Sequence, residues 1–114
     1  MKIVSKEVND VIILDLDGNI KSSDDLEVFT SSIDEAIASG KKKVLLNFEG
    51  VNFINSSGLG RLIMAIRKMG EVQASLKVSN LGNDLGELFA FTKLSEKVSI
   101  HDTEEEALTD FNAS

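Results

Sequence analysis

Apolar and polar residues follow two different periods along the first half of the chain. Residues 4–8 and 11–16 are rich in β-branched residues and are separated by Asn9 and Asp10, a pair typical of tight turns, so the pattern predicts an opening β-hairpin. Ser22 and Ser23 then offer N-cap oxygens, and Gly40 is a helix-ending residue, so a helix is expected between them. Its apolar residues recur at helical spacing as Leu26, Phe29, Ile33, Ala36 and Ile37.

The second half of the chain continues to alternate strands with helices. Residues 44–48 are apolar on both faces, which favours a buried central strand. After an extended piece at residues 51–54, a second amphipathic helix begins near Ser56. Its predicted buried stripe is Leu59, Leu62, Ile63, Ile66 and Met69. Further strands are expected at residues 75–79 and 97–101, a short helix at residues 85–91, and a last helix behind the capping-box pair Thr103 and Glu106.

The order of these elements is β-β-α-β-α-β-α-β-α. Strands that alternate with helices predict an α/β fold with a mostly parallel sheet, right-handed crossovers, and helices packed on the sheet that the hairpin opens. The 114 residues suit one compact domain and contain no repeat, linker or low-complexity segment. Residues 1–114 are therefore expected to form a single domain.

The composition narrows the classes of function. A net charge of −7 disfavours nucleic acid and membranes as partners, since nucleic acid and anionic lipid both bind basic surfaces. The sequence has no cysteine and one histidine, His101, so no metal, no cofactor and no catalytic residue is assigned. No apolar run has the length of a membrane span, and the first residues lack a signal-peptide core, so a cytoplasmic protein is expected.

Residues 46–60 contain the strongest functional signal. A predicted buried strand ends there, the chain turns, and Ser56 and Ser57 stand at the start of a helix that also contains Gly58 and Gly60. Free backbone amides and the helix dipole at such an end favour negative charge, including a covalently attached phosphate. Glycine in a helix costs up to about 1 kcal/mol relative to alanine, so two glycines imply a local reason, such as the approach of another protein or of a nucleotide phosphate.

A simpler interpretation of these residues stays open at this point. Asparagine and serine are common N-caps, so Asn55 or Ser56 can start the helix and have no further role. The two glycines would then serve only to permit close packing. The spacing alone favours this interpretation over the functional one.

The run from Asn55 to Gly60, Asn-Ser-Ser-Gly-Leu-Gly, resembles the signature of the STAS-domain anti-sigma factor antagonists, where Asp-Ser-Ser/Thr-Gly-Leu-Gly follows a buried strand and opens a helix. The resemblance extends to the length, the opening hairpin, the Asp17-Gly18 turn and the acidic C-terminal helix. It implies a STAS-type fold and a protein that is not an enzyme. In that family a partner that is both anti-sigma factor and kinase phosphorylates the serine after the acidic position. That serine is Ser56 here, with Ser57 as the second choice.

The resemblance also implies a partner-switching function. The unphosphorylated form would bind the anti-sigma factor and free the sigma factor, whereas phosphate on Ser56 would prevent binding until a phosphoserine phosphatase removed it. The chain by itself is expected to be a monomer. The residues expected to contact the partner are Lys21, Ser22, Asn55, Ser56, Ser57, Gly58, Leu59, Gly60 and Arg61.

Two positions depart from the family pattern. Asn55 replaces the usual aspartate, so it can cap the helix but has no charge to position a metal or a lysine of the kinase. Lys21 stands near the first helix, where family members often have an aspartate. If Lys21 lies beside Ser56, it would reduce the repulsion that a phosphate meets there.

Two other classes of function remain to be compared with this one. An enzyme is disfavoured because Gly58-x-Gly60 lacks the remaining residues of a dinucleotide or phosphate-binding loop and no Gly-x-Ser-x-Gly elbow is present. A STAS scaffold that is never phosphorylated, or a nucleotide-sensing subunit of a transport or signalling complex, is the other alternative. Asn55 is the residue that favours it.

Overall fold

A five-stranded mixed sheet forms the centre of the structure, a computed structural model that describes residues 1–113. The strands lie in the order β1 (Lys2–Val8), β2 (Val11–Asp17), β3 (Lys43–Gly50), β4 (Ser75–Ser79) and β5 (Ser99–His101). β1 and β2 are antiparallel and every other neighbouring pair is parallel. The predicted hairpin and the predicted mostly parallel sheet are both confirmed.

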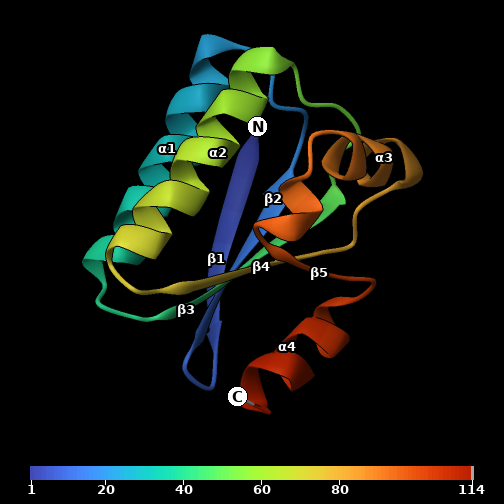
Figure 1. The fold of residues 1–114 in the computed structure, drawn as a ribbon. Helices are drawn as coiled ribbons and strands as arrows, with labels where there is room; N and C mark the ends of the chain where they lie inside the picture. The colour runs from blue at the N-terminus through green and yellow to red at the C-terminus, as the bar shows by residue number, and fades with distance from the viewer. Residues whose placement is uncertain (114) are drawn as a thin grey trace.

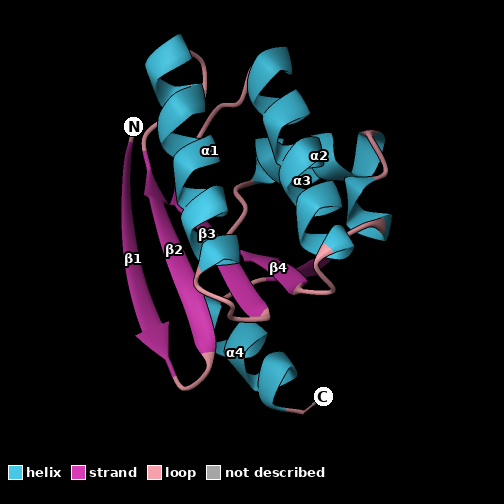
Figure 2. Ribbon diagram, turned by 90° about the vertical axis from the view of Figure 1, so that its left-hand side faces the viewer, coloured by secondary structure: helices cyan, strands magenta, loops and turns pink. Residues whose placement is uncertain are grey.

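The helices cover the sheet on both faces (Figure 1). They are α1 (Ser23–Ala38), α2 (Ser56–Glu71), α3 (Asn83–Phe91) and α4 (Glu104–Asn112), with one 3-10 turn at Leu94–Glu96. α1 and α2 run side by side on one face, as Figure 2 also shows, and α4 packs on the other. The element order is the predicted one. Among residues 1–113, no helix has both the length and the apolar character needed to cross a bilayer.

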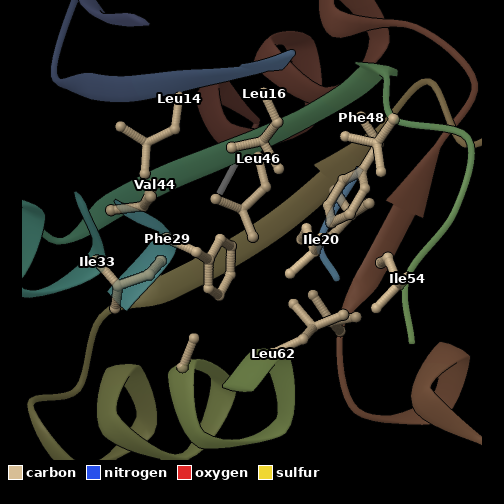
Figure 3. Packing of buried hydrophobic residues seen from close by; sticks show 14 of the residues in the cluster. Leu14, Leu16, Ile20, Phe29, Ile33, Val44, Leu46, Phe48, Ile54 and Leu62 are labelled. Atoms are coloured by element: carbon tan, nitrogen blue, oxygen red, sulfur yellow. The ribbon is translucent and has the colours of Figure 1, made fainter. Parts of the chain in front are cut away.

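β3 is the buried central strand that its apolar run predicts. Val44, Leu46 and Phe48 face the larger hydrophobic cluster beneath α1 and α2, whereas Leu45 faces the smaller cluster beneath α4. Figure 3 shows the larger cluster, in which the side chains of Leu46 and Phe48 meet residues from the helices and from the loops at the end of the sheet. Burial on both faces explains why this strand shows no alternation of polar and apolar residues.

The prediction for the buried stripe of α2 is wrong at one residue. Ile63 is 40% exposed, and the buried residues of the helix are Gly58, Leu62, Ala65 and Met69. Two of these, Gly58 and Ala65, are small, and an added Cβ at Gly58 would lie 2.8 Å from side-chain carbons of Ile20 and Ile54. A prediction from apolar bulk alone includes the exposed Ile63 and omits these two small buried residues.

The predicted strand at residues 97–101 is shorter in the structure. The chain continues to turn after the 3-10 helix at Leu94–Glu96, because the amide of Val98 donates to the carbonyl oxygen of Leu94 at 3.1 Å. Residues 97 and 98 are therefore held in a turn, and β5 pairs with β4 only from Ser99 onward.

The topology brings the starts of α1 and α2 to the same end of the molecule. β2 and β3 are parallel neighbours, and each is followed by a helix on the same face of the sheet. Both helices consequently begin beyond the carboxyl ends of these strands (Figure 1). The loop at residues 18–22 and the loop at residues 51–55 meet at this end, where ligands and partners of parallel sheets commonly bind.

Candidate functional site

The two loops that precede α1 and α2 are joined by backbone hydrogen bonds. The amide of Ile20 donates to the carbonyl oxygen of Phe53 at 3.1 Å, and the amide of Asn55 donates to the carbonyl oxygen of Ile20 at 3.1 Å. Ile20 and Ile54 form an isolated parallel bridge, and both side chains are buried beneath the start of α2 near Leu62 (Figure 3). The backbone before α2 is thus held in place by the neighbouring loop.

Asn19 provides a further connection that the sequence did not predict. Its Oδ1 accepts hydrogen bonds from the amides of Asn52 and Phe53 at 3.0 and 3.1 Å. Phe53 is fixed by this contact while its side chain remains 50% exposed. The one signal in the sequence was the Asp17-Gly18-Asn19 turn, because asparagine in a turn often bonds to nearby backbone.

Asn55 caps α2 and uses both ends of its amide. Oδ1 accepts from the amide of Gly58 at 2.9 Å, and Nδ2 donates to the carbonyl oxygen of Lys21 at 3.0 Å. The interpretation of Asn55 as the N-cap is confirmed. An aspartate could accept the first bond, but its carboxylate has no hydrogen to donate in the second.

Ser56 is the first residue of α2, and its side chain is exposed. Ser57 is exposed as well, and within residues 1–113 neither hydroxyl forms a hydrogen bond. The amides of Ser56 and Ser57 likewise have no partner in this part of the chain. An exposed hydroxyl beside two free amides at a helix N-terminus is open to modification, and an attached anion would be stabilised there.

Within residues 1–113, α2 is the α-helix without an acidic residue in its first turn. α1, α3 and α4 begin with acidic side chains, which compensate the positive end of each helix dipole. At α2 the corresponding position is left to Ser56 and Ser57. The positive end of this helix is therefore uncompensated by side chains from its own first turn.

Lys21 and Ser22 lie next to this helix end, which meets the condition set for Lys21 in the sequence analysis. Lys21 is exposed and its carbonyl oxygen contacts Asn55. Ser22 is the N-cap of α1, and its Oγ accepts from the amide of Asp25 at 3.1 Å. The structure therefore brings the start of α1 and the phosphate-acceptor candidate Ser56 onto one surface.

Arg61 is directed away from that surface toward α1. Its Nη1 donates to Oγ1 of Thr30 at 2.7 Å, and the side chain is half-buried. Leu59 is also half-buried and packs against the larger hydrophobic cluster. Both residues thus have partners within the chain, and Arg61 connects the two helices.

Asp25 is an acidic residue of the site that the sequence did not single out. The α-amino group of Met1, 2.9 Å away, and the backbone amides of Ser22 and Lys21 donate to its carboxylate. These donors, the amino group first, hold the pKa of the Asp25 carboxyl well below its usual range. Asp25 thereby fixes the loop that contacts Asn55.

Gly58 and Gly60 have different surroundings. A Cβ added at Gly58 would lie 2.8 Å from Cγ2 of both Ile20 and Ile54, so the packing of the two loops requires this glycine. A Cβ added at Gly60 would meet no atom within 4 Å. Close packing within the chain therefore explains the glycine at position 58, whereas it does not explain the glycine at position 60.

The profile of the STAS domain family matches residues 2–107 of this chain. Among solved structures, TM1081 of Thermotoga maritima, a candidate anti-sigma factor antagonist, superposes with a TM-score of 0.86 at 23% identity over 95% of this chain and 92% of that one. At this identity the likeness shows the fold.

SpoIIAA is a second similar structure and is described as an anti-sigma factor antagonist and a Bacillus cell fate determinant. Its unphosphorylated form has a TM-score of 0.75 at 22% identity and covers 99% of both chains. Its phosphorylated form has the same TM-score at 24% identity, over 96% of this chain and 99% of that one. Both forms therefore share the fold described here.

The same fold also occurs inside a transporter. The murine anion transporter Slc26a9 matches with a TM-score of 0.78 at 14% identity, over 96% of this chain but only 19% of the transporter. The STAS fold alone therefore does not determine the function of a chain that has it.

Proposed function

Because this chain belongs to the STAS domain family, we propose that it is an anti-sigma factor antagonist that phosphorylation of Ser56 switches off. In its unphosphorylated form it binds an anti-sigma factor that is also a serine kinase, and the sigma factor is released. The phosphorylated form does not bind. A phosphoserine phosphatase returns the protein to its binding form.

The observation that supports this proposal best is the state of the Ser56 hydroxyl. It is exposed and unbonded at the first residue of α2, next to two free amides and without an acidic neighbour in the first turn. A kinase can approach it without unfolding the chain. The helix end then stabilises the product, since negative charge is favoured at a helix N-terminus.

The modification is a phosphoryl transfer from ATP, bound by the partner, to Oγ of Ser56. The bond between the γ-phosphorus and its bridging oxygen breaks, a bond from Oγ to phosphorus forms, and ADP leaves. The hydroxyl proton passes to a base that the kinase supplies. No residue of this chain takes part except Ser56 as the acceptor, so the chain is a substrate and regulator rather than an enzyme.

Phosphate on Ser56 prevents docking through charge and desolvation. It adds about −1.5 to −2 charges at neutral pH and three acceptor oxygens. On a contact surface these oxygens must lose water or face the partner's own groups. Each 1.4 kcal/mol so lost weakens binding about tenfold.

Serine kinase assays with intact-mass detection test this proposal. The purified chain is incubated with ATP and each candidate anti-sigma factor kinase, and we expect the mass of one phosphate on the native chain and none on Ser56→Ala. Ser57→Ala is the matched control, because it removes the neighbouring exposed hydroxyl, and it should be phosphorylated normally. Phosphate on Ser56→Ala would move the acceptor to Ser57.

A STAS scaffold that is never phosphorylated is the second candidate. Asn55 favours it, because an uncharged N-cap offers no carboxylate to a kinase's metal or lysine. Under this alternative no candidate kinase adds phosphate, and a Ser56→Asp variant binds its partner as the native chain does. Under the leading proposal, by contrast, the native chain gains one phosphate and Ser56→Asp loses partner binding, so the kinase assay and a binding assay of Ser56→Asp separate the candidates.

A further inference from the structure

An open cavity lies at the carboxyl ends of β2, β3 and β4, beside the start of α4. Its volume of about 530 Å³ is in the range of small-molecule sites in proteins. Four carboxylates line it, those of Asp15, Asp17, Glu49 and Glu104, and we call it the acidic cavity. α4 lies on the face of the sheet opposite to α1 and α2, so this cavity is separate from the surface that displays Ser56.

The sheet changes from apolar to polar where the acidic cavity opens. On the face beneath α4, Ile13 and Leu45 belong to the smaller hydrophobic cluster. Two residues further along the strands, Asp15, Asn47 and Ser79 lie next to one another in register. Side chains two apart on a strand share a face, so this polar row points to the same side as the apolar one.

Two oxygen atoms at this place lack hydrogen-bond partners. Oγ of Ser79, a fully buried residue, and Oδ1 of Asn80, which lines the acidic cavity, form no hydrogen bond within residues 1–113. Buried polar atoms in native proteins nearly always have a partner, and those without one call for an explanation such as a ligand. A ligand with N–H groups would supply the donor that Asn80 lacks.

Asn47 positions the acidic residues around the cavity. It is 8% exposed, its Nδ2 donates to Oε1 of Glu104 at 3.1 Å, and its Oδ1 accepts from the amide of Glu49 at 2.9 Å. The second bond lies where the register of β2 and β3 shifts between Asp15 and Asp17. Such irregularities re-aim side chains, and they are common next to binding sites.

Gly50 allows the carboxylate of Asp17 to lie against β3. A Cβ added at Gly50 would lie 3.0 Å from Oδ1 of Asp17 and 2.7 Å from the carbonyl oxygen of Leu16. Any larger residue at position 50 would displace this carboxylate or the backbone beside it. The glycine thus gives Asp17 its place at the edge of the acidic cavity.

Two of the four carboxylates already hold a cation of the chain itself. Nζ of Lys6 lies 3.6 Å from Asp15 and 3.3 Å from Glu104. Asp17 and Glu49 are exposed and have no ion-pair partner within residues 1–113. The potential of the cavity is therefore negative, and the two unpaired carboxylates favour a second cation.

The arrangement of these groups suits an extended organic cation better than a metal ion. Within residues 1–113, no group of three or more metal-ligating side chains is placed to hold a metal. The unsatisfied acceptors instead extend from Asp17 on β2 to Asn80 after β4. Neighbouring strands lie about 4.8 Å apart, so these acceptors span about 10 Å. Amines spaced along an aliphatic chain can reach both ends.

We propose that the acidic cavity binds a small aliphatic polyamine. One ammonium group lies between Asp17 and Glu49, and a second N–H group donates to Oδ1 of Asn80. Lys6 keeps Asp15 and Glu104 paired and forms the wall of the site. Ser56 has no part in this binding, so the inference is independent of the proposed function.

Calorimetry with spermidine tests this inference, in about 150 mM salt to screen general attraction to a chain of net charge −7. The double variant Asp17→Asn, Glu49→Gln should bind about tenfold more weakly than the native chain, because it loses charge-assisted hydrogen bonds. The matched control is Asp84→Asn, Glu87→Gln, which removes the same charges from exposed residues of α3 and should bind normally. Equal affinity of the two double variants, or no saturable binding to the native chain, overturns the inference. Mg²⁺ that binds as tightly as spermidine also overturns it.

Nuclear magnetic resonance locates the ligand on the native chain without any substitution, so the test does not depend on how the variants fold. On addition of spermidine, the side-chain amide signals of Asn47 and Asn80 and the backbone amide signal of Gly50 should shift. The side-chain amide signal of Asn83, exposed at the start of α3, should stay in place. Shifts spread over the exposed acids of the whole chain, with none at Asn80, would overturn the inference.

Discussion

The side-chain amide of Asn55 donates a hydrogen bond to the carbonyl oxygen of Lys21, 3.0 Å away, while its oxygen caps α2. One side chain therefore fixes the helix that displays Ser56 and the loop that displays Lys21. A positive side chain and the proposed phosphate acceptor are thereby held at the same end of the molecule.

Replacing Asn55 tests this double role. Asn55→Ala loses the cap and the link to Lys21, so its free energy of unfolding should fall by about 1–2 kcal/mol in urea denaturation. Asn55→Asp keeps an acceptor for the amide of Gly58 and should lose less. Asn52→Ala, at an exposed asparagine of the same loop, is the control and should be neutral. Equal stability of Asn55→Ala and the native chain would show that the cap contributes nothing.

Gly58 should tolerate no larger side chain. In Gly58→Ala the new methyl would lie 2.8 Å from side-chain carbons of Ile20 and Ile54, and 2.9 Å from the carbonyl oxygen of Ile20. Backbone and buried side chains must shift to admit it, so we expect a loss of about 1–3 kcal/mol in the free energy of unfolding. A Gly58→Ala variant as stable as the native chain would mean that the two loops move to admit the methyl group at no cost in free energy.

Much of the fold can be predicted from the sequence because local signals and burial agree. The Asn9-Asp10 turn, the cap at Ser22 and the run at residues 44–48 each indicate the element that the structure contains. The strand at residues 75–79 has the predicted bounds. In each case the local turn residues or the hydrophobic period favour the same element that the packing of the whole domain requires.

The remaining features depend on contacts between distant segments. The apolar period places Ile63 on the buried stripe, whereas the buried face of α2 runs through Gly58, Leu62, Ala65 and Met69 and leaves Ile63 40% exposed. The contacts of Asn19 and Thr30 join residues more than 30 positions apart, which no local pattern reveals. At the site, Asn55 and Ser56 were identified from a motif, whereas the different surroundings of the two glycines required coordinates.

Stability should depend on pH through Asp25. The α-amino group of Met1 and two loop amides donate to its carboxylate. The pKa of the Asp25 carboxyl is therefore lower in the folded chain than in the unfolded chain, where it is near the ordinary 3.8. The stabilisation of the folded chain by this carboxylate is present above about pH 4 and is lost as the pH falls further.

Urea denaturation at pH 7 and pH 3 measures this effect. Asp25→Asn should be less stable than the native chain at pH 7, and the gap between the two should narrow at pH 3. Asp24→Asn, at the exposed neighbouring acid, is the control and should show no such pattern. A gap between Asp25→Asn and the native chain that stays constant with pH would contradict the role assigned to this carboxylate.

Lys21 should stabilise the phosphorylated form selectively. Its position beside Asn55 brings a positive charge near an anion on Ser56, although solvent weakens the attraction at an exposed residue. In thermal denaturation, phosphorylated Lys21→Ala should be less stable than the phosphorylated native chain by about 0.5 kcal/mol, with the unphosphorylated pair equal. Lys97→Ala, at an exposed distant lysine, controls for the change in net charge. No difference between the two phosphorylated proteins would exclude this role for Lys21.

The affinity of one anti-sigma factor kinase for the native chain, measured by calorimetry before and after enzymatic phosphorylation of Ser56, tests the central claim most directly. The account predicts binding before phosphorylation and a loss of at least about tenfold afterwards, which corresponds to about 1.4 kcal/mol. Ser56→Ala, treated in the same way, should bind equally before and after. Undiminished binding of the chain with phosphate on Ser56 would contradict the account.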